Sequence, residues 1–353
     1  MTWLALAWMA LALSLGLVEV VIRIARRRQW LDRPNERSSH QVPTPRLGGL
    51  GVLVAASITL GLAAAMGTVP STDAPRTAVL LGVGAIALLG LLDDLRSLPS
   101  APRMIVQLLV ALAVVKGGVR LDLAFLEAPW RDIVSFGASA LWLVWLTNLY
   151  NFMDGSDGLA ASQGIVALLT FCAPFLLHAP DLALILGILA AALAGFLLHN
   201  VSPARVFMGD ALATSLGFLL GAMGLLSPRL APEGVSPLFG VLAGSPFVFD
   251  ATFTLVRRML RGEPFWRAHR SHVYQTLLVL GWSHRGVHLL YTGLAALSAA
   301  LALVNPGESR AMWTAAIILL HVGFLAGAIV VRRRKASMET AVATTSSLPE
   351  RQT

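Results

Sequence analysis

Residues 133–177 read IVSFGASALWLVWLTNLYNFMDGSDGLAASQGIVALLTFCAPFLL, which is two apolar runs with a short polar segment between them. Each run approaches the roughly 20 apolar residues that a helix needs to cross a bilayer. The polar segment contains two carboxamides and two carboxylates, from Asn148, Asn151, Asp154 and Asp157. The stretch therefore predicts two membrane spans joined by a connection that is rich in polar side chains.

The rest of the chain repeats this pattern. Of its 353 residues, 56% are hydrophobic and only 13% are charged, whereas a soluble domain usually carries about a quarter charged residues. We therefore expect an all-α, polytopic transmembrane helical bundle of about eleven spans, with ten as the alternative. The predicted spans lie near residues 2–24, 46–68, 77–95, 102–119, 133–150, 159–177, 181–199, 211–226, 235–256, 285–304 and 311–331.

The two ends of the chain differ in character. The first apolar run, Trp3 to Val21, has no basic segment before it and no small-residue cleavage site after it. A retained first span is therefore expected rather than a removed signal peptide. Residues 1–335 are expected to form one integral membrane domain, and the polar, Ser/Thr-rich residues 336–353 a disordered cytoplasmic tail. The single cysteine, Cys172, excludes an intramolecular disulfide.

Basic residues predict the orientation of the bundle. One side of the membrane receives the tail and the loops near 25–45, 93–103, 148–158, 200–210 and 257–284. That side carries 21 of the 27 Lys and Arg residues, and the other side carries the remaining 6. By the positive-inside rule the first side is cytoplasmic, so the N-terminus lies outside and the C-terminus inside. Because these residues flank apolar runs and form no basic domain, no nucleic-acid partner is expected.

Carboxylates and cations gather in the predicted cytoplasmic loops. Asp93 and Asp94 end the third span, where adjacent carboxylates oppose the helix dipole. We expect a general base, a metal ligand or one of each there. Arg103 begins the next span, where it either neutralises phosphate oxygens or anchors the helix at the membrane surface. Asp210 either caps the eighth span or joins the site, with Phe207 nearby as a ring for stacking.

The four polar residues between the fifth and sixth spans recur at every third position. If the fifth span continues as a helix, this spacing puts them on one face. If the glycines break the helix, they form a loop of oxygen ligands. Both geometries present hard oxygen donors, which suit Mg²⁺, with Mn²⁺ as the alternative.

Two further groups complete the candidate site. Asp250 lies inside the predicted ninth span, where a carboxylate is costly and indicates either function or pairing with a basic neighbour. His269, Arg270 and His272 lie in a long basic loop. Because they lack further ligands for zinc, we expect them to be cationic donors to a diphosphate. The sequence thus predicts a metal–phosphate site at the cytoplasmic membrane surface, where positioning and charge neutralisation supply most of the catalysis.

Six segments, taken in order, resemble the polyprenyl-phosphate N-acetylhexosamine-1-phosphate transferases (glycosyl transferase family 4), the superfamily that includes the phospho-MurNAc-pentapeptide translocase. The likeness is greatest to the branch that starts O-antigen and related glycans. It implies transfer of a sugar-1-phosphate from a UDP-N-acetylhexosamine to undecaprenyl phosphate, with release of UMP, in the bacterial inner membrane. The segments are DRPNERSSHQVPTPRLGG, LLDDLRSLPSAPRMIVQ, NLYNFMDGSDGLA, RVFMGDALATSLG, FDATFTLVRR and HRSHVYQ, and they cover about residues 32–275.

The resemblance also implies roles for individual residues. Asn151 and Asp210 would contact Mg²⁺. Asp93 or Asp94 would activate or position the lipid phosphate. The nucleotide–metal site would be lined by Asp154 and Asp157. The residues that would bind the nucleotide, the diphosphate or the sugar are Arg46, within the segment Pro43 to Gly49, and Arg103, Asn148, Phe207, Asp250, His269, Arg270 and His272.

Several questions stay open at this level. Arg103 stands where the family often has Lys, and HRSH differs from the histidine-rich form of the peptidoglycan enzyme, which disfavours that substrate. GlcNAc, FucNAc and QuiNAc are all candidate sugars, because discrimination by one hydroxyl depends on pocket geometry. A one-step or a covalent mechanism and a monomer or a homodimer are equally open. A secondary transporter, the alternative class, predicts ionisable residues near the midplane and an internal repeat, whereas the carboxylates here cluster at one face and no convincing repeat is found.

Overall fold

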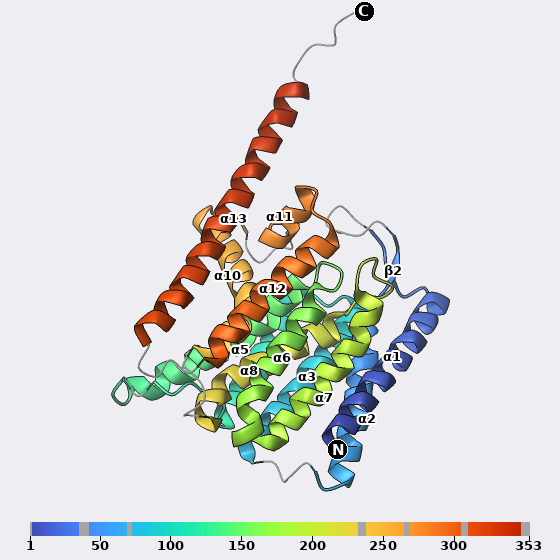
Figure 1. Ribbon diagram of the computed structural model, residues 1–353, viewed down its shortest axis with the longest axis vertical. Helices are drawn as coiled ribbons and strands as arrows, with labels where there is room; N and C mark the ends of the chain where they lie inside the picture. The colour runs from blue at the N-terminus through green and yellow to red at the C-terminus, as the bar shows by residue number, and fades with distance from the viewer. Residues whose placement is uncertain are drawn as a thin grey trace, which may run out of the picture.

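The computed structural model describes residues 2–34, 42–68, 73–123, 125–231, 238–264, 269–304 and 310–346, and these residues form a bundle of helices (Figure 1). The elements in chain order are α1 (Thr2–Arg28), β1 (Leu31–Asp32), β2 (Thr44–Pro45), α2 (Gly48–Ala65), α3 (Ala74–Arg96), α4 (Ser100–Lys116), α5 (Trp130–Met153), α6 (Leu159–His178), α7 (Pro180–Asn200), α8 (Asp210–Leu230), α9 (Phe239–Ala243), α10 (Ser245–Leu260), α11 (Val273–Val279), α12 (His284–Leu303) and α13 (Arg310–Ser346).

The helices confirm the predicted class of a polytopic helical membrane protein. Each of the eleven predicted apolar runs coincides with a helix, and the ninth run coincides with α9 and α10 together. Within the described residues, nine helices are long and apolar enough to cross a membrane. They are α1, α2, α3, α5, α6, α7, α8, α12 and α13. The helices α4 and α10 are shorter, with 17 and 16 residues.

Helix α8 is the centre of the bundle, and every residue from Ala211 to Met223 is buried. Small residues allow its neighbours to come close, as is common between membrane helices. A Cβ at Gly217 would lie 2.4 Å from the backbone oxygen of Leu146 on α5, and a Cβ at Gly90 on α3 would lie 2.5 Å from that of Asp210. Helices α3 and α5 therefore pack directly on α8, which fixes their ends relative to its first turn.

The predicted continuous span over 235–256 is wrong for its described part. The helix breaks at Gly244, between the short α9 and α10. Pro246 lies in the first turn of α10, where a missing backbone N–H costs nothing. Because proline has no N–H, it cannot donate a hydrogen bond to the helical turn before it, so the helix does not continue through this position. The break frees α10 to carry Asp250 into the interior of the protein, where this residue is 1% exposed.

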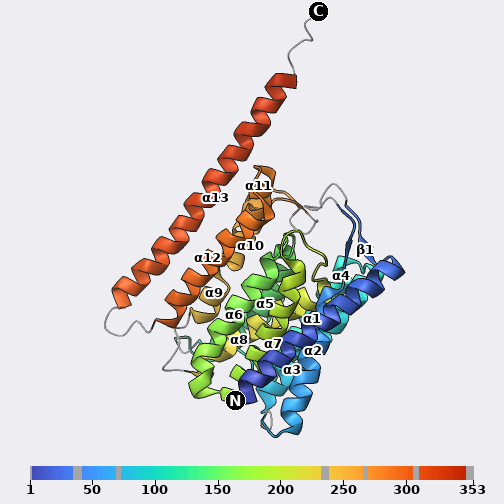
Figure 2. The same ribbon diagram turned by 45° about the vertical axis from the view of Figure 1, so that its right-hand side comes forward.

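The chain ends in a long peripheral helix, α13, which extends beyond the bundle (Figure 2). The sequence predicts a disordered tail from residue 336, whereas the helix continues to Ser346. Residues 336–346, ASMETAVATTS, contain Ala, Met and Glu and follow a formed helix, so they extend it without the cost of nucleation. The rest of the predicted tail, 347–353, lies outside the described residues.

Loops and short elements gather at one end of the bundle, which we call the polar end. Helices α3, α5 and α7 finish there, and α4, α6 and α8 begin there. The β1–β2 pair, in which Leu31 lies opposite Pro45, and the short helix α11 also lie at this end, uppermost in Figure 1. Every residue that the sequence predicts for the site lies on these ends and loops or on α10, which packs beside α11.

Candidate functional site

The carboxylate of Asp94 caps helix α8. Its Oδ1 accepts the N–H of Asp210 and its Oδ2 the N–H of Ala211, both at 3.0 Å. These N–H groups have no partner within the helix, and the positive end of the helix dipole favours a carboxylate. Gly209 precedes them with φ +80°, and a Cβ there would lie 2.9 Å from Asp94 Oδ2. The MGD turn therefore requires glycine, and Asp94 is used to position it.

Beside this cap lies a cluster of two acids and one cation. Arg103 Nη1 pairs closely with Asp93 Oδ2 and lies 3.4 Å from Asp210 Oδ2. The second oxygen of Asp93 accepts the N–H of Leu98 at 2.7 Å. The Asp93 and Asp210 carboxyl groups lie within hydrogen-bonding reach of each other. The side chain of Asp210 is 30% exposed and that of Asp93 only 7%, so Asp210 is the acid with oxygen surface open to a ligand.

The predicted nucleotide segment lies along the chain that leads into this cap. The N–H of Phe207 donates to Pro45 O at 2.9 Å, Gly48 N–H donates to Phe207 O at 2.9 Å, and Gly49 N–H donates to Met208 O at 2.8 Å. A Cβ at Gly49 would lie 2.3 Å from the Leu212 Cβ, so the two segments meet without room for a side chain. The first turn of α2 is thus fixed against the MGD turn.

This packing brings Arg46 and Phe207 to the cluster. The Arg46 guanidinium is an electrostatic neighbour of Asp94. Its Nε is buried and has no hydrogen-bond partner in the described part of the chain. A buried guanidinium N–H is costly to leave unpaired, and an anionic ligand would satisfy it. Arg46 therefore has a buried donor beside Asp94 that is unpaired among the described residues.

The polar connection after α5 combines the two geometries that the sequence leaves open. Helix α5 continues to Met153, so Asn148 and Asn151 lie on its last turns. Asp154 and Asp157 lie beyond it in a loop that ends at α6. The four residues therefore do not share one helical face. Only the amides are presented by a helix, and the acids are presented by the loop.

Asn148 and Asp157 serve mainly to fix neighbouring elements. Asn148 Nδ2 donates to Gln107 Oε1 on α4 at 2.7 Å. Asp157 Oδ2 accepts the N–H of Ala204 at 3.1 Å, and Oδ1 lies 3.9 Å from His284 Nδ1. Asn200 Oδ1 accepts the N–H of Gly158 at 3.0 Å. These contacts join the loop after α5 to the loop before α8, so Asp157 contributes to the shape of the site.

Asp154 is a partly buried acid of this loop. Burial, and then the nearby charges of Asp94 and Asp157, raise the pKa of the Asp154 carboxyl well above its usual range. Burial disfavours the charged form of an acid, and like charges add to this effect. In the protein alone Asp154 therefore retains its proton to a higher pH than an ordinary aspartate. Such a perturbed acid beside a polar cluster is typical of functional sites.

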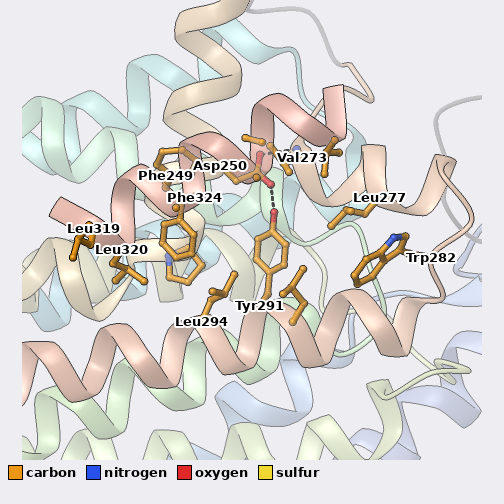
Figure 3. A pocket seen from close by; sticks show the side chains of 16 residues that line it. Phe249, Asp250, Val273, Leu277, Trp282, Tyr291, Leu294, Leu319, Leu320 and Phe324 are labelled. Atoms are coloured by element: carbon orange, nitrogen blue, oxygen red, sulfur yellow. Dashed lines mark hydrogen bonds between the residues drawn. The ribbon is translucent and has the colours of Figure 1, made fainter. Parts of the chain in front are cut away.

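Asp250 caps α11 instead of facing the acidic cluster. Its oxygens accept the N–H groups of Val273 at 2.7 Å and Tyr274 at 3.0 Å, and the hydroxyl of Tyr291 at 2.6 Å (Figure 3). The Thr254 hydroxyl donates at 3.2 Å, and His272 Nδ1 lies 3.5 Å away. Direct contact with a substrate would require these bonds to break. The sequence predicts Asp250 as a substrate contact, whereas the structure uses it to hold the HRSH segment.

The HRSH segment lies against the loop after α5. Tyr274 donates its hydroxyl to Phe152 O at 3.2 Å, and the rings of His272 and Phe152 are 6.3 Å apart. His272 is only 3% exposed. Burial, followed by the charge of His272, lowers the pKa of the His269 imidazole to about 4. Burial thus opposes the cationic form of His269 that the sequence predicts.

The structure thus forms two connected groups. Asp93, Asp94, Arg103 and Asp210 form the first, with Arg46 and Asp154 as electrostatic neighbours. The second contains His269, Arg270 and His272, held by Asp250, and it meets the loop after α5 through the contact between Tyr274 and Phe152. Phe207 lies in the segment that is hydrogen-bonded to Pro45 and Gly48, and Asn151 lies on the last turn of α5, so both are at the polar end.

The sequence analysis missed several residues that shape the site: Gln107, Asn200, Tyr274, His284 and Tyr291. One signal was available for Asn200, a polar residue that ends an apolar run directly before the RVFMGD segment. Tyr291 has no such signal, because one tyrosine within an apolar run is more often a membrane or core residue. Its function depends on its partner Asp250, which only the fold brings close.

The donor set suits a hard cation that arrives with phosphate. Within the described residues, no group of three or more His, Cys, Asp or Glu side chains is arranged to hold a metal by itself. Mg²⁺ usually takes one or two protein carboxylates together with substrate phosphates and water. The Asp93–Asp210 pair, with the Asn151 amide on the neighbouring helix end, fits this pattern. Zinc does not, because its usual nitrogen and sulfur ligands are absent from the pair.

Comparison with known proteins identifies the same part of the chain. A family model described as glycosyl transferase family 4 matches residues 76–227. This range includes Asp93, Asp94, Arg103, Asp154 and Asp210 and excludes Asp250 and the HRSH segment.

Three bacterial relatives are each 32% identical to this chain. One is a probable undecaprenyl-phosphate N-acetylglucosaminyl 1-phosphate transferase of Bacillus subtilis, over 75% of this chain and 74% of the relative. A decaprenyl-phosphate N-acetylglucosaminephosphotransferase of Mycobacterium tuberculosis matches over 86% and 83%. A phospho-N-acetylmuramoyl-pentapeptide-transferase of Rubrobacter xylanophilus matches over 69% and 77%. Similarity thus extends over most of each chain.

Proposed function

Because the chain belongs to glycosyl transferase family 4 and is a polyprenyl-phosphate sugar-phosphate transferase, we propose that it transfers N-acetylhexosamine-1-phosphate from a UDP-sugar to undecaprenyl phosphate. UMP is the second product. The observation that carries this proposal is the cluster of Asp93, Arg103 and Asp210 beside the cap made by Asp94. It combines hard oxygen ligands with a fixed cation at the end of a membrane bundle, as transfer between a nucleotide diphosphate and a lipid phosphate requires.

The reaction is a displacement at phosphorus. An oxygen of the lipid phosphate attacks the β-phosphorus of the UDP-sugar, the bond from that phosphorus to the bridging oxygen breaks, and UMP leaves. Any proton on the attacking phosphate, whose second pKa is about 6, passes to an aspartate. We assign this role to Asp93 and not to Asp94, because Asp93 lies in the cluster with Arg103 and Asp210, whereas the carboxylate of Asp94 caps α8.

The remaining residues bind and orient the substrates. Asp210 and Asn151 would hold Mg²⁺, which when bound neutralises the diphosphate. Arg46, with its unpaired buried Nε in the described region, suits a phosphate oxygen of the nucleotide. Arg270 supplies a further cation from the HRSH segment. Asp154, whose pKa is raised well above its usual range by burial, suits a neutral donor to a nucleotide or phosphate oxygen.

Two finer assignments complete the proposal. GlcNAc is the first sugar to test, because the names of the Bacillus and Mycobacterium relatives contain it, and FucNAc and QuiNAc follow. The lipid-linked product would begin an O-antigen or a related surface glycan. Peptidoglycan and teichoic-acid lipid intermediates, made by the same chemistry, are the alternatives.

The first experiment measures UMP release by the purified protein with undecaprenyl phosphate, Mg²⁺ and a panel of UDP-N-acetylhexosamines. We expect metal-dependent UMP with one donor, its loss in EDTA, and a decrease of about 100-fold or more in Asp210→Asn. Asp122→Asn is the matched control, since Asp122 is 76% exposed and pairs with Arg131 away from the cluster. Absence of UMP with every donor, from a protein that elutes as a folded species, rejects the proposal.

A second experiment tests the proposal that the polar end faces the cytoplasm. In a Cys172→Ala background, single cysteines replace Arg334 at the polar end of α13 and Arg131 near the opposite end of α5. A membrane-impermeant thiol reagent applied to intact cells should label Arg131→Cys alone. Labelling of Arg334→Cys alone would reverse the proposed orientation.

A further inference from the structure

Two apolar grooves flank the contact between α10 and α13, which we call the α10–α13 seam. The seam is closed by the rings of Phe249 and Phe324, whose centroids are 5.4 Å apart, and by a hydrogen-bonding contact of 3.2 Å between Ser245 Oγ and His321 Nε2. The two helices therefore touch along one line, and space remains on either side of it.

The first groove lies between the seam and α12 and has a volume of about 480 Å³ (Figure 3). Leu294, Leu319 and Phe324 are among its apolar walls, and its polar residues Asp250 and Tyr291 are already bonded to each other. On the α13 side it is lined by Gly323 and Gly327, where an added Cβ would meet no atom within 4 Å. This groove is open to an apolar chain.

The second groove lies on the other side of the seam and has a volume of about 600 Å³. Its walls include Val248, Phe253, Val256 and Leu260 of α10. In a protein that spans a membrane, apolar grooves between helices are filled by hydrocarbon chains, because water gains nothing there. Both grooves share Phe249, so chains in the two would lie beside one another across the seam.

Arginines lie where both grooves reach the polar end. Arg257 and Arg261 line the second groove, and Arg332 follows Val331, which lines the first. The charges of these three residues act on one another.

The acids near these arginines are already paired. Glu263 is paired with another residue, Arg258, at 2.6 Å. Glu263 also acts on Arg257, and Asp250, the acid that acts on Arg332, is committed to the cap of α11. The end of the seam therefore has an excess of positive charge.

Part of this charge is buried without an acceptor. Nε and Nη2 of Arg332 and Nε of Arg257 are buried and find no hydrogen-bond partner among the described residues. An arginine that only anchors a helix at the membrane surface keeps its donors in water. Buried unpaired guanidinium donors are costly, and a phosphate oxygen is their best acceptor. The seam thus joins two hydrocarbon grooves to an anion site.

We propose that the α10–α13 seam binds an anionic phospholipid of the bilayer, with one acyl chain in each groove and its phosphate on Arg257 and Arg332. Two grooves that converge on one cationic end match a diacyl lipid, whereas a polyprenyl phosphate has a single chain. Moreover, neither groove is lined by any of Asp93, Asp94, Asp154 or Asp210. A reacting carrier phosphate must reach those acids, so the seam is a second lipid site.

The test is native mass spectrometry of the full-length protein in detergent, titrated with dioleoyl phosphatidylglycerol or with phosphatidylcholine of the same chains. We expect one phosphatidylglycerol to bind at least tenfold more tightly than phosphatidylcholine. Arg257→Gln/Arg332→Gln should weaken it about 25-fold, since each basic residue near an anionic lipid contributes about fivefold. Arg333→Gln/Arg334→Gln removes the same charge from exposed positions on α13 and should retain tight binding.

A second variant separates the grooves from the charges. Gly323→Leu/Gly327→Leu fills the first groove, changes no charge, and should also weaken phosphatidylglycerol at least tenfold while the protein elutes as before. The proposal is overturned if either variant binds like the wild type, if the Arg333/Arg334 control loses as much affinity, or if phosphatidylcholine binds equally. It is also overturned if equimolar undecaprenyl phosphate displaces the phospholipid, because the carrier lipid is then the occupant.

Discussion

The Asp94 carboxylate on α3 accepts the N–H of Asp210, the first residue of α8, at 3.0 Å. This bond ties the two most suggestive acidic motifs of the sequence, DD and MGD, into one unit. Asp93, the residue before Asp94, makes a different contact, which is a close ion pair with Arg103. The two adjacent aspartates thus make different contacts, because Asp94 caps a helix and Asp93 pairs with a cation.

That difference predicts different effects for two similar substitutions. In Asp94→Asn the amide NH₂ faces an N–H of α8 and leaves it unpaired, so the free energy of unfolding should fall by about 1–2 kcal/mol. Asp93→Asn keeps an oxygen for Leu98 but loses the charge that pairs with Arg103. Because Arg103 is 32% exposed and also lies 3.4 Å from Asp210, the loss of stability should be smaller than in Asp94→Asn. Both variants should lose UMP release by about 100-fold or more, measured beside thermal unfolding in detergent. A larger loss of stability in Asp93→Asn would contradict the assignment.

Gly209→Ala tests the close approach at the MGD turn. The φ of +80° is unfavourable for alanine, and the new Cβ would lie 2.9 Å from Asp94 Oδ2. We expect a loss of about 1–3 kcal/mol in unfolding free energy and at least tenfold in turnover, because the cap must shift. Gly61→Ala on α2 is the control, since its Cβ meets no atom within 4 Å. Equal behaviour of the two variants would remove the argument for the turn.

The Asp250–Tyr291 bond leads to a third prediction. Tyr291→Phe removes a bond of 2.6 Å to a carboxylate, and Tyr150→Phe removes one of the same length to the carbonyl of Ala160. Bonds to charged groups are worth about 1.5–3 kcal/mol and neutral bonds about 0.5–1.5 kcal/mol, so Tyr291→Phe should destabilise the protein more.

A local measurement separates positioning from general stability. If Asp250 holds the HRSH segment, limited proteolysis with trypsin at Arg270 should be faster in Tyr291→Phe than in the wild type. It should be unchanged in Tyr150→Phe, whose hydroxyl bonds to the first turn of α6. Equal cleavage at Arg270 in all three proteins would show that the Asp250–Tyr291 bond does not position the segment.

These contacts also show how far the sequence reaches. Apolar length predicts a helix for every span, because burial in lipid leaves few alternatives to a helix. It does not predict the break at Gly244, since glycine and proline are tolerated within membrane helices. Motifs identify Asp93, Asp94 and Asp210 as candidates. The role of Asp94 as a cap on another helix depends on a tertiary contact between residues 116 positions apart, which no local pattern encodes.

The same limit explains the error at Asp250. An acid inside an apolar run correctly indicates importance, but its partners come from α11 and from Tyr291 on α12. The sequence places α11 in a cytoplasmic loop and gives no sign that it returns to the end of α10. Charge alone also predicts a cationic His269, whereas burial, followed by the charges of His272 and several arginines, lowers the pKa of its imidazole.

His269 therefore predicts a pH dependence of stability. Burial lowers the pKa of its imidazole from 6.5 to about 4, so between these values the unfolded chain binds a proton that the folded protein does not. Titration of His269 therefore does not lower the free energy of unfolding above about pH 6.5, and lowers it increasingly as the pH decreases towards 4. The quantity to measure is the unfolding temperature of His269→Gln in detergent minus that of the wild type. This difference should be more positive at pH 5 than at pH 7.5. A difference of the opposite sign would mean that His269 is charged in the folded protein.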